Sequence, residues 1–331
     1  MPELRKCPIT GRWVIISTER ARRPLNLRLQ TEEYAPGINP FQPGNEYLTP
    51  PEILAYRPGG AANSPNWSLR VIPNKYPALR VEGTLDKEGA GPYDKMNGVG
   101  AHEVIIETPD PNLRFSQYNE QTLQQVFRAY RDRIVDLKRD VRLKYILIFK
   151  NEGSSAGATQ SHSHSQLIAL PIVPKAVAEE LRGAKTYSEY KERCIYCDII
   201  KYELKDGSRL IAENPEMAAV APYASRYPFE TWILPRRHES YFETTNNEQF
   251  VFLSKIFSET MRRLEKALPR LSYNIVLHTS PLNEGEFPHY HWHFEITTRI
   301  TQVAGFERGS GFYINPTPPE QAAGYLRKIR L

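Results

Sequence analysis

Residues 151–171 read NEGSSAGATQSHSHSQLIALP, and this segment decides how the fold is interpreted. It follows an apolar run at 145–149 that is typical of a β-strand, and it opens into a loop of small residues. Gly153 and Gly157 permit backbone conformations with positive φ and a close approach to a ligand. Successive amide N–H groups in such a loop can bind a phosphate. The segment therefore predicts a phosphate-binding loop between two strands.

Two histidines lie at the end of this loop. His162, His164 and Gln166 are spaced two residues apart, so in a strand their side chains would point to the same face. A neutral imidazole beside a phosphate-binding loop is a candidate nucleophile toward phosphorus. The alternative is an ordinary hairpin that happens to contain two histidines. The Gly/Ser loop directly upstream favours a functional site.

The composition is that of a soluble globular protein. Of the 331 residues, 40% are hydrophobic and 24% are charged, and no apolar run approaches the ~20 residues of a membrane span. The first residues, MPELRKCPITGRW, lack the apolar core of a signal peptide, so we expect a cytoplasmic protein without a membrane partner. The net charge of +5 is spread along the chain. It suits anionic phosphate ligands but gives no reason to expect nucleic-acid binding.

The second half of the chain repeats the order of elements in the first half. Apolar residues recur at helical spacing in 121–137 and again in 249–264, which predicts two amphipathic helices. Each helix starts with an Asn-Glu-Gln sequence and is followed by a strand, a loop and a strand with a His-x-His pattern. The agreement indicates an internal duplication.

The spacing between helix and histidine aligns the two copies. Gln121 precedes His162 by 41 residues, and Gln249 precedes His291 by 42 residues. The same alignment pairs His164 with His293 and Gln166 with Glu295. We therefore expect two domains, residues 1–172 and residues 173–331.

Only the second half contains the residues of a tetrahedral metal site. Its C-I-Y-C sequence indicates half of a metal site or a redox pair in a reducing compartment. Two histidines would complete a Cys2His2 set of the type that zinc prefers, and four protein ligands would make that site structural. The predicted ligands are Cys194, Cys197, His238 and His291. His289 and His293 are alternatives for the fourth ligand, and a metal-free cysteine pair is the alternative for the whole site. Cys7 is expected to be a free thiol.

The first half lacks the corresponding ligands. At the aligned positions a metal would need Asn39, Gln42 or Pro111, and a proline side chain cannot coordinate a metal. We therefore predict a metal-free first half in which His162 holds its neighbours by hydrogen bonds.

Over almost its whole length, the chain resembles the galactose-1-phosphate uridylyltransferases of the histidine-triad superfamily. The motifs that carry the resemblance are CPITGRWVIIS and RARRP near the start, PFQPGNE at 40–46, NKYPAL at 74–79, NEGSSAGATQSHSHSQ at 151–166, CIYC, the PRRH histidine, HYHWHFEI and AGFERGSGFYINPTPPEQAA. The resemblance implies an α+β fold of two tandem histidine-triad-like domains. Each would be an antiparallel sheet with packed helices, commonly in a homodimer.

The resemblance also implies a double-displacement reaction. His164 matches the family's nucleophile, which attacks the α-phosphorus of UDP-glucose and becomes uridylylated. Galactose 1-phosphate then takes the UMP group to give UDP-galactose. Gln166 matches the residue that holds the phosphoryl group, whereas a third histidine there would indicate the hydrolase branch.

Further residues match the family's substrate-binding segments. The resemblance places Arg20 and Arg23 on a basic turn that serves the phosphates, Asn74 and Tyr76 near uracil and ribose, Asn151, Ser155, Gly157 and Thr159 on the phosphate loop, and Gly305, Phe306 and Glu307 at the hexose. Three of these sets have a plain structural alternative. Arg20 and Arg23 could form a solvated basic turn, Tyr76 could belong to the core, and Phe306 and Glu307 could lie in a loop packed at a dimer surface.

The chain departs from the family pattern at several positions. Asn39-Pro-Phe-Gln42 stands where other members have a first-half Cys pair, and Pro111 stands where they have a histidine. The usual His-Pro-His is His-Ser-His, and Lys75 replaces an acidic residue that often contacts the nucleoside. The C-terminal segment resembles that of the adenylyl-sugar branch. Two alternatives therefore stand beside uridylyl transfer: an ADP-sugar or dinucleotide phosphorylase, and an inactive zinc-stabilised nucleotide-binding protein.

Overall fold

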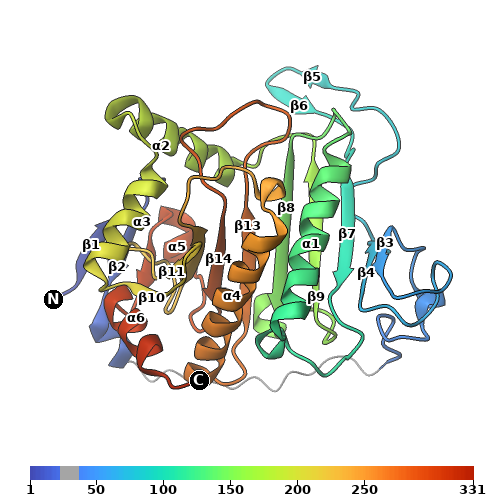
Figure 1. Cartoon of the computed structure of the whole chain (residues 1–331). Helices are drawn as coiled ribbons and strands as arrows, with labels where there is room; N and C mark the ends of the chain where they lie inside the picture. Colours follow the sequence, from blue (N-terminus) through green and yellow to red (C-terminus); the bar gives the residue numbers. More distant parts are fainter. Residues whose placement is uncertain (23–36) are drawn as a thin grey trace.

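The computed structural model describes residues 1–22 and 37–331, so the predicted substrate residue Arg23 lies outside the described part of the chain. The described residues form one ten-stranded antiparallel sheet with helices packed against it (Figure 1). In spatial order its strands are β10 (Leu210–Glu213), β11 (Met217–Val220), β12 (Thr231–Pro235), β14 (His293–Thr298), β13 (Tyr273–His278), β8 (Tyr145–Glu152), β9 (His164–Leu170), β7 (Ala101–Ile106), β4 (Leu69–Pro73) and β3 (Leu54–Tyr56). The predicted α+β class is confirmed.

The strand order is symmetric about its centre. β8 and β13 pair in the middle, with Phe149 opposite Val276, and four strands follow outward on each side. In each half a long helix precedes the central strand, α1 (Glu120–Leu137) before β8 and α4 (Asn247–Ala267) before β13. This arrangement supports the internal duplication. One sheet runs through both halves, so the division between residues 172 and 173 remains a prediction.

The two long helices begin at capped ends, close to where the apolar spacing predicts them. The side chain of Asn119 accepts a hydrogen bond from the backbone of Thr122 at the start of α1. Asn246 and Gln249 form a reciprocal capping box at the start of α4. Both caps satisfy backbone N–H groups that have no partner within the helix.

The apolar faces of both helices meet over the same side of the sheet (Figure 1). The ring of Phe127 on α1 lies 5.2 Å from that of Phe257 on α4 and 5.6 Å from that of Phe294 on β14. All three side chains are buried. The two halves therefore share one continuous hydrophobic core.

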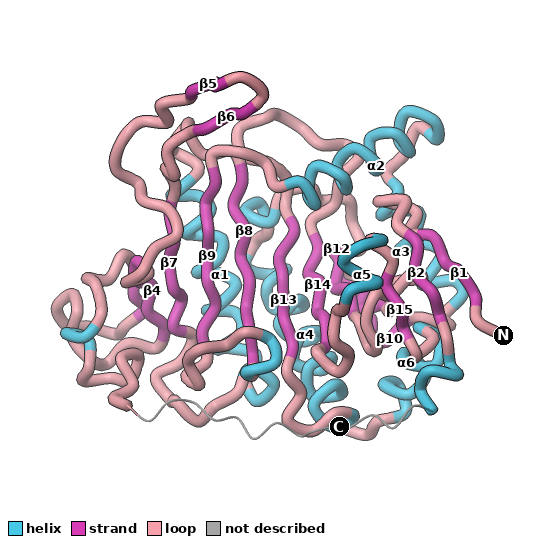
Figure 2. The backbone as a smooth tube through the Cα atoms, turned by 180° about the vertical axis from the view of Figure 1, so that it is seen from behind, coloured by secondary structure: helices cyan, strands magenta, loops and turns pink. Residues whose placement is uncertain are grey.

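The opposite face of the sheet differs between the halves. Figure 2 shows β7, β9 and β8 from this side with no α-helix of the described residues over their middle. A three-stranded sheet and the short helix α5 (Gly305–Ser310) lie over the second half. The strands of this sheet are β1 (Glu3–Lys6), β2 (Trp13–Ile16) and β15 (Tyr313–Asn315). The other elements are α2 (Lys175–Lys191), α3 (Ile195–Asp206), α6 (Pro319–Lys328) and the hairpin of β5 (Glu88–Ala90) and β6 (Tyr93–Lys95). In the described part of the chain, we find no helix with the length and apolarity to cross a membrane.

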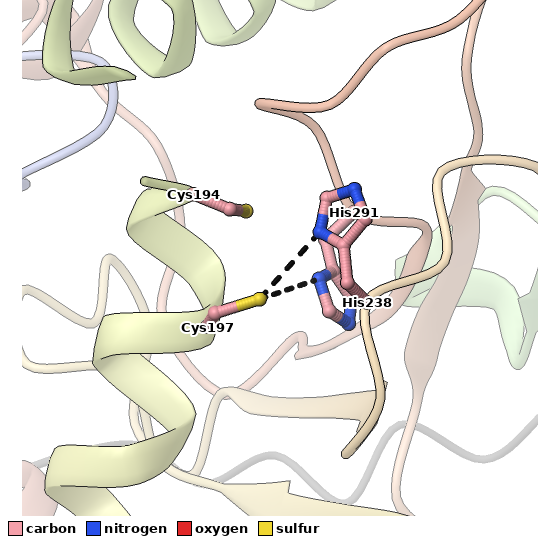
Figure 3. A group of neighbouring side chains, drawn as sticks. All are labelled: Cys194, Cys197, His238 and His291. Atoms are coloured by element: carbon pink, nitrogen blue, oxygen red, sulfur yellow. Dashed lines mark hydrogen bonds between the residues drawn. The ribbon is translucent and has the colours of Figure 1, made fainter. Parts of the chain in front are cut away.

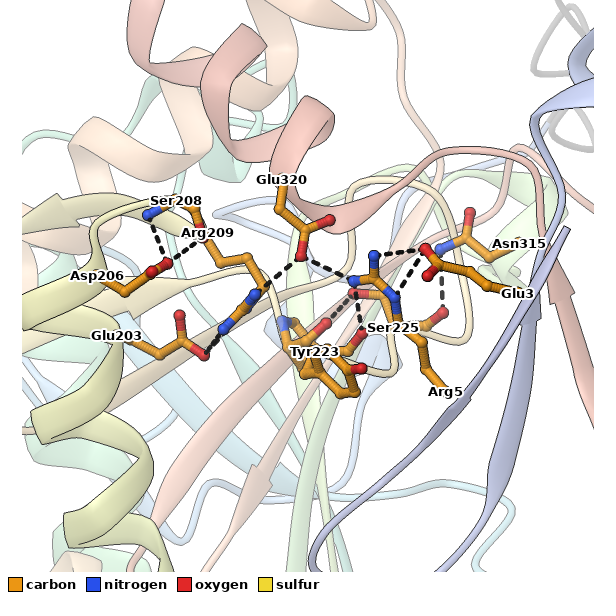
Figure 4. A network of polar contacts seen from close by, with 11 residues as sticks. Glu3, Arg5, Glu203, Asp206, Ser208, Arg209, Tyr223, Ser225, Asn315 and Glu320 are labelled. Carbon is orange, nitrogen blue, oxygen red and sulfur yellow. Dashed lines mark hydrogen bonds and ion pairs between the residues drawn. The ribbon is translucent and has the colours of Figure 1, made fainter. Parts of the chain in front are cut away.

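An ion-pair network ties the N-terminal strand to the second half (Figure 4). Glu320 on α6 accepts hydrogen bonds from both Arg5 and Arg209, at 2.8 Å each. Arg209 also pairs with Glu203 on α3 at 2.9 Å. Both arginines are buried, so the network holds β1 against the second half although the two are far apart in sequence.

Candidate active site and metal clusters

His164 lies at the first position of β9 with its ring packed edge-on against Phe41, at 5.3 Å between ring centroids. Its Nδ1–H donates to the carbonyl of His162 at 2.8 Å, so Nε2 carries the lone pair. Burial lowers the pKa of His164 to about 4, and the ring is therefore neutral near pH 7. An oriented, neutral imidazole with Nε2 unprotonated is chemically suited to nucleophilic attack.

His162 is held as the sequence predicted, by hydrogen bonds. Its Nε2–H donates to the carbonyl of Thr108 at 2.7 Å, and Nδ1 accepts from the amide of Asn39 at 3.0 Å. Asn39 therefore occupies the Nδ1 side of the ring. Burial lowers the pKa of His162 as well, which keeps this hydrogen-bonding pattern in the neutral form.

The serines of the HSHS sequence point to the other face of the strand, into a buried polar cluster that sequence reasoning missed. Ser163 and Ser165 both donate to the carboxylate of Glu107, which is fully buried. Lys150 pairs with Glu107 at 2.8 Å and donates to the carbonyl of His164 at 3.2 Å. The cluster thus fixes the strand directly behind the two histidines. The alternating His and Ser pattern was its only sequence signal.

Gln166 is also held by a residue that sequence reasoning missed. The Nδ1 atom of His102 on β7 accepts from the backbone N–H of Ala78 at 3.1 Å, so the ring proton lies on Nε2. This Nε2–H donates to Oε1 of Gln166 at 2.9 Å. The amide NH2 of Gln166 is therefore the end that is left to donate to a phosphoryl oxygen. Asn74 Nδ2 lies 3.2 Å from the same ring nitrogen, which brings this predicted nucleoside residue next to the site.

The predicted phosphate loop has the conformation that its glycines permit. Gly153 and Gly157 both have positive φ, at 83° and 87°, and flank a single 3-10 turn of Ser154–Ala156. Asn151 is the seventh residue of β8 and enters this loop. Ser155 and Thr159 lie on the loop after the end of β8 and are not buried. The loop joins β8 to β9, so it lies beside His164.

The other predicted substrate residues lie on elements other than the strand that carries His164. Arg20 is exposed in a 3-10 turn after β2, and α5 carries Gly305, Phe306 and Glu307. Figure 1 and Figure 2 both show α5 over the second half, and Arg308 of this helix borders the same groove as Ser154 to Gly157 of the phosphate loop. Tyr76 is 82% exposed, which excludes the alternative of a core tyrosine.

The four predicted metal ligands come together in the second half (Figure 3). Their ligand atoms all lie within 4.8 Å of one another. Cys194 and Cys197 flank the first turn of α3, and Cys197 Sγ lies 3.5 Å from His238 Nδ1 and 3.8 Å from His291 Nδ1. Hydrogen bonds from Cys197, His238 and His291 hold the pKa of the Cys194 thiol far below its ordinary value. A thiolate with two imidazoles and a second sulfur is the donor chemistry of a closed zinc site.

The choice of His291 over its neighbours follows from the duplication. Its Nε2–H donates to the carbonyl of Pro235 at 2.8 Å, as His162 donates to Thr108 in the first half. The bond leaves Nδ1 directed at the cysteines, as expected of an oriented metal ligand. The carbonyl of His289, and not its ring, lies next to this cluster, 3.5 Å from Cys194 Sγ. The ring of His293 belongs to another cluster.

A second group of possible ligands was not found from the sequence. Glu180, His278, His293 and Glu295 are all buried, with ligand atoms within 4.8 Å of one another. His278 Nδ1 lies 3.0 Å from Glu180, and its pKa is raised to about 10 because the two carboxylates outweigh the cost of burial. Arg226 pairs with Glu295 at 2.5 Å. The group could hold a metal, and without one it is a network of buried ion pairs.

This group occupies the position in the second half that the His164 site has in the first. His293 repeats the hydrogen bond of His164, with Nδ1 3.1 Å from the carbonyl of His291. However, His293 is 1% exposed, and the rings of Tyr196 and Trp232 each lie 5.2 Å from it. His164 is 8% exposed, so the second-half copy is the more deeply buried of the two.

Residues 1–174 match the family described as galactose-1-phosphate uridyl transferase, N-terminal domain, and residues 114–328 match a domain family of unknown function, DUF4921. An ADP-glucose phosphorylase from Arabidopsis thaliana is 38% identical over 337 residues, covering 100% of this chain and 93% of that protein. A galactose-1-phosphate uridylyltransferase from Thermotoga maritima is 27% identical over 340 residues, covering 100% of this chain and 99% of that protein. The crystal structure of an Arabidopsis ADP-glucose phosphorylase with bound ADP-glucose aligns with a TM-score of 0.87 at 37% identity over 100% of both chains. A uridylyltransferase structure aligns with a TM-score of 0.78 at 25% identity, over 99% of this chain and 97% of the other.

Proposed function

Because the chain belongs to the galactose-1-phosphate uridylyltransferase family, we propose that it transfers a nucleotidyl group through a covalent intermediate on His164. Nε2 would attack the α-phosphorus of a nucleotide sugar, and the bond from phosphorus to the bridging oxygen would break. A sugar 1-phosphate leaves with that oxygen. An acceptor phosphate then attacks the same phosphorus and frees the histidine. The observation that carries the proposal is the neutral, oriented His164 beside a loop with two positive-φ glycines.

Each step needs donors placed before the charge develops on phosphorus. The amide NH2 of Gln166 is such a donor, whereas the backbone N–H groups of Ala156 and Gly157 are already bonded within the 3-10 turn. His102 fixes the Gln166 amide so that its NH2, and not its oxygen, faces away from His102. The buried cluster of Lys150 and Glu107 holds the strand that carries the nucleophile.

For the substrate, we favour an ADP-sugar as donor and inorganic phosphate as acceptor, giving ADP and a sugar 1-phosphate. The support is the full-length similarity to an ADP-glucose phosphorylase, at 38% identity against 27% for the uridylyltransferase from Thermotoga maritima. Lys75, which replaces an acidic nucleoside contact, points the same way. Uridylyl transfer from UDP-glucose to galactose 1-phosphate is the second candidate. Its support is the family match and the retained Asn74 beside His102.

We further propose one zinc ion held by Cys194, Cys197, His238 and His291. Its role would be structural and not catalytic. We also propose a cytoplasmic homodimer. Gly305, Phe306 and Glu307 would serve the hexose from α5, since Arg308 of the same helix borders the groove beside Ser154 to Gly157. Small-molecule nucleotide sugars are the expected partners, without nucleic acid or membrane.

The test is the intact mass of the protein after brief incubation with ADP-glucose, or separately with UDP-glucose, without an acceptor. A gain of one AMP, absent in His164→Gly, would support the adenylyl reaction, and phosphate should then discharge the adduct. A gain of one UMP would favour the second candidate and keep the mechanism. An absence of any adduct with either sugar would overturn the histidine assignment and favour a nucleotide-binding protein without catalysis.

A further inference from the structure

The phosphate loop is held by a residue from the other half of the chain. Asn274 lies on β13, opposite Asn151 on β8, at the seam between the two halves. Its side-chain NH2 donates to Oδ1 of Asn151 at 2.6 Å and to the carbonyl of Ala156 at 2.9 Å. These two bonds join the end of β8 to the 3-10 turn of the loop. One side chain therefore sets the distance between the end of β8 and the turn of Ser154–Ala156.

The Asn274 amide has no freedom to turn over. Its Oδ1 accepts a hydrogen bond from Nε of Arg299, and the guanidinium of Arg299 lies over the ring of Tyr227 at 5.0 Å. Both N–H donors and the oxygen of the amide are thus engaged, and the residue is 8% exposed. The orientation of the Asn274 amide is fixed by the cation behind it.

This orientation fixes that of Asn151 in turn. Oδ1 of Asn151 is committed to Asn274, so the NH2 group of Asn151 is the end that remains available. That nitrogen lies 4.0 Å from the point where a Cβ on Gly157 would stand, at the left-handed turn of the loop. Asn151 therefore presents a donor, and not an acceptor, toward the phosphate loop.

The loop and Arg299 border the same open space. A groove of ≈ 1200 Å³ runs between the first-half loop, Ser154 to Gly157, and the second-half segments around Arg270 and Arg299. Residues of the phosphate loop line one part of this groove, and Arg270, Arg299 and Arg308 line another. An anion in the groove would meet both halves of the chain.

We propose that Asn274, held by Arg299, is a positioning residue for nucleotidyl transfer, which turns the Asn151 amide so that its NH2 faces the transferred phosphate. This inference rests on the proposed function of His164. It also gives the second half a part in the reaction, although its own histidine, His293, is only 1% exposed.

The discriminating variant is Asn274→Asp, which has nearly the same size and keeps an acceptor for Arg299. The new carboxylate offers no donor to Asn151 Oδ1 or to the Ala156 carbonyl, so the Asn151 amide must turn over and face the phosphate with its oxygen. Loss of one donor to a charged group predicts a fall of roughly 10- to 100-fold in the rate constant for adduct formation on His164. The fall should appear at saturating nucleotide sugar, because the donor acts on the charge that develops at phosphorus.

Asn283→Asp is the matched control. Asn283 also donates its amide across the two halves, to the carbonyl of Lys138 at 2.9 Å, but it makes this contact away from the phosphate loop. The control should form the adduct at the wild-type rate. An equal fall in both variants would mean that any lost bond between the halves has this effect, and it would overturn the positioning role.

Hydrogen exchange of the amides at 153–158 gives a second readout that does not depend on activity. Asn274→Asp should raise the exchange rate in this loop and leave that of β8 unchanged. If the wild-type protein forms no adduct with any nucleotide sugar, the proposed function fails, and loop exchange alone decides whether Asn274 holds the loop. If the variant forms the adduct at the wild-type rate and its loop exchanges as in the wild type, the inference is wrong.

Discussion

Replacing Lys150 with methionine should destabilise the protein more than almost any other single change of a charged residue. The Lys150 side chain is 1% exposed and its partner Glu107 is 0% exposed, at 2.8 Å. Methionine keeps the length of the aliphatic chain but leaves the carboxylate of Glu107 buried without a cation. Breaking a buried pair in this way costs about 3–5 kcal/mol. Because Glu107 keeps hydroxyl donors from Tyr118 and Ser163, we expect a loss of about 3 kcal/mol, the lower end of that range.

The assay is urea unfolding of Lys150→Met, Glu107→Gln and the double variant, compared with the wild type. Removing both charges should restore a large part of the stability, because no buried charge is then left unpaired. Lys95→Met is the control. Lys95 pairs with Glu88 at 3.4 Å, and the two side chains are 75% and 65% exposed. The unfolding midpoint of this variant should therefore not move measurably. A loss below about 1 kcal/mol in Lys150→Met, or a double variant less stable than Lys150→Met, would refute this account of the cluster.

The rate of adduct formation on His164 should stay constant from about pH 8 to pH 5.5 and fall as the pH approaches 4. The reason is that burial lowers the pKa of this histidine to about 4 and only the neutral ring attacks. A midpoint near 6.5, the ordinary value for histidine, would contradict the buried geometry. The His102→Phe variant keeps a ring but lacks the donor to Gln166. Its rate of adduct formation should fall by about tenfold, with little change in melting temperature. An unchanged rate would mean that His102 does not orient the Gln166 amide. The Cys197→Ser variant should lose most of its bound zinc and melt at a lower temperature. The control Cys7→Ser, which changes a buried thiol outside the metal cluster, should keep one zinc per chain. Equal metal content in the two variants would exclude the Cys2His2 site.

The local features of the site could be predicted from the sequence because they depend on short stretches. The positive φ of Gly153 and Gly157 and the common face of the two histidines follow from residue type and from the two-residue period of a strand. The helices α1 and α4 follow from their apolar spacing and their Asn caps. The repeat also identified Cys194, Cys197, His238 and His291 as one set, since the duplication aligns elements that are far apart in the chain.

The partners of these residues were decided only by the tertiary structure. Glu107, Lys150, His102 and Asn274 each stand in an ordinary strand sequence, and nothing near them in the chain signals a role. Antiparallel pairing brings Asn274 opposite Asn151, 123 positions away, and His102 beside Gln166, 64 positions away. The same holds for the cluster around His278, which the alignment of histidines did not reveal.

Tertiary structure also decided where the other predicted substrate residues lie. Arg20 and the residues of α5 belong to the predicted substrate site, and β2 and α5 lie over the second half, where Arg308 of α5 borders the groove beside the phosphate loop. The amino-acid sequence by itself determined which local conformations and which chemical groups the chain has. The packing of distant strands decided which of those groups meet, because hydrogen bonds and ion pairs act over a few ångströms whatever the separation along the chain.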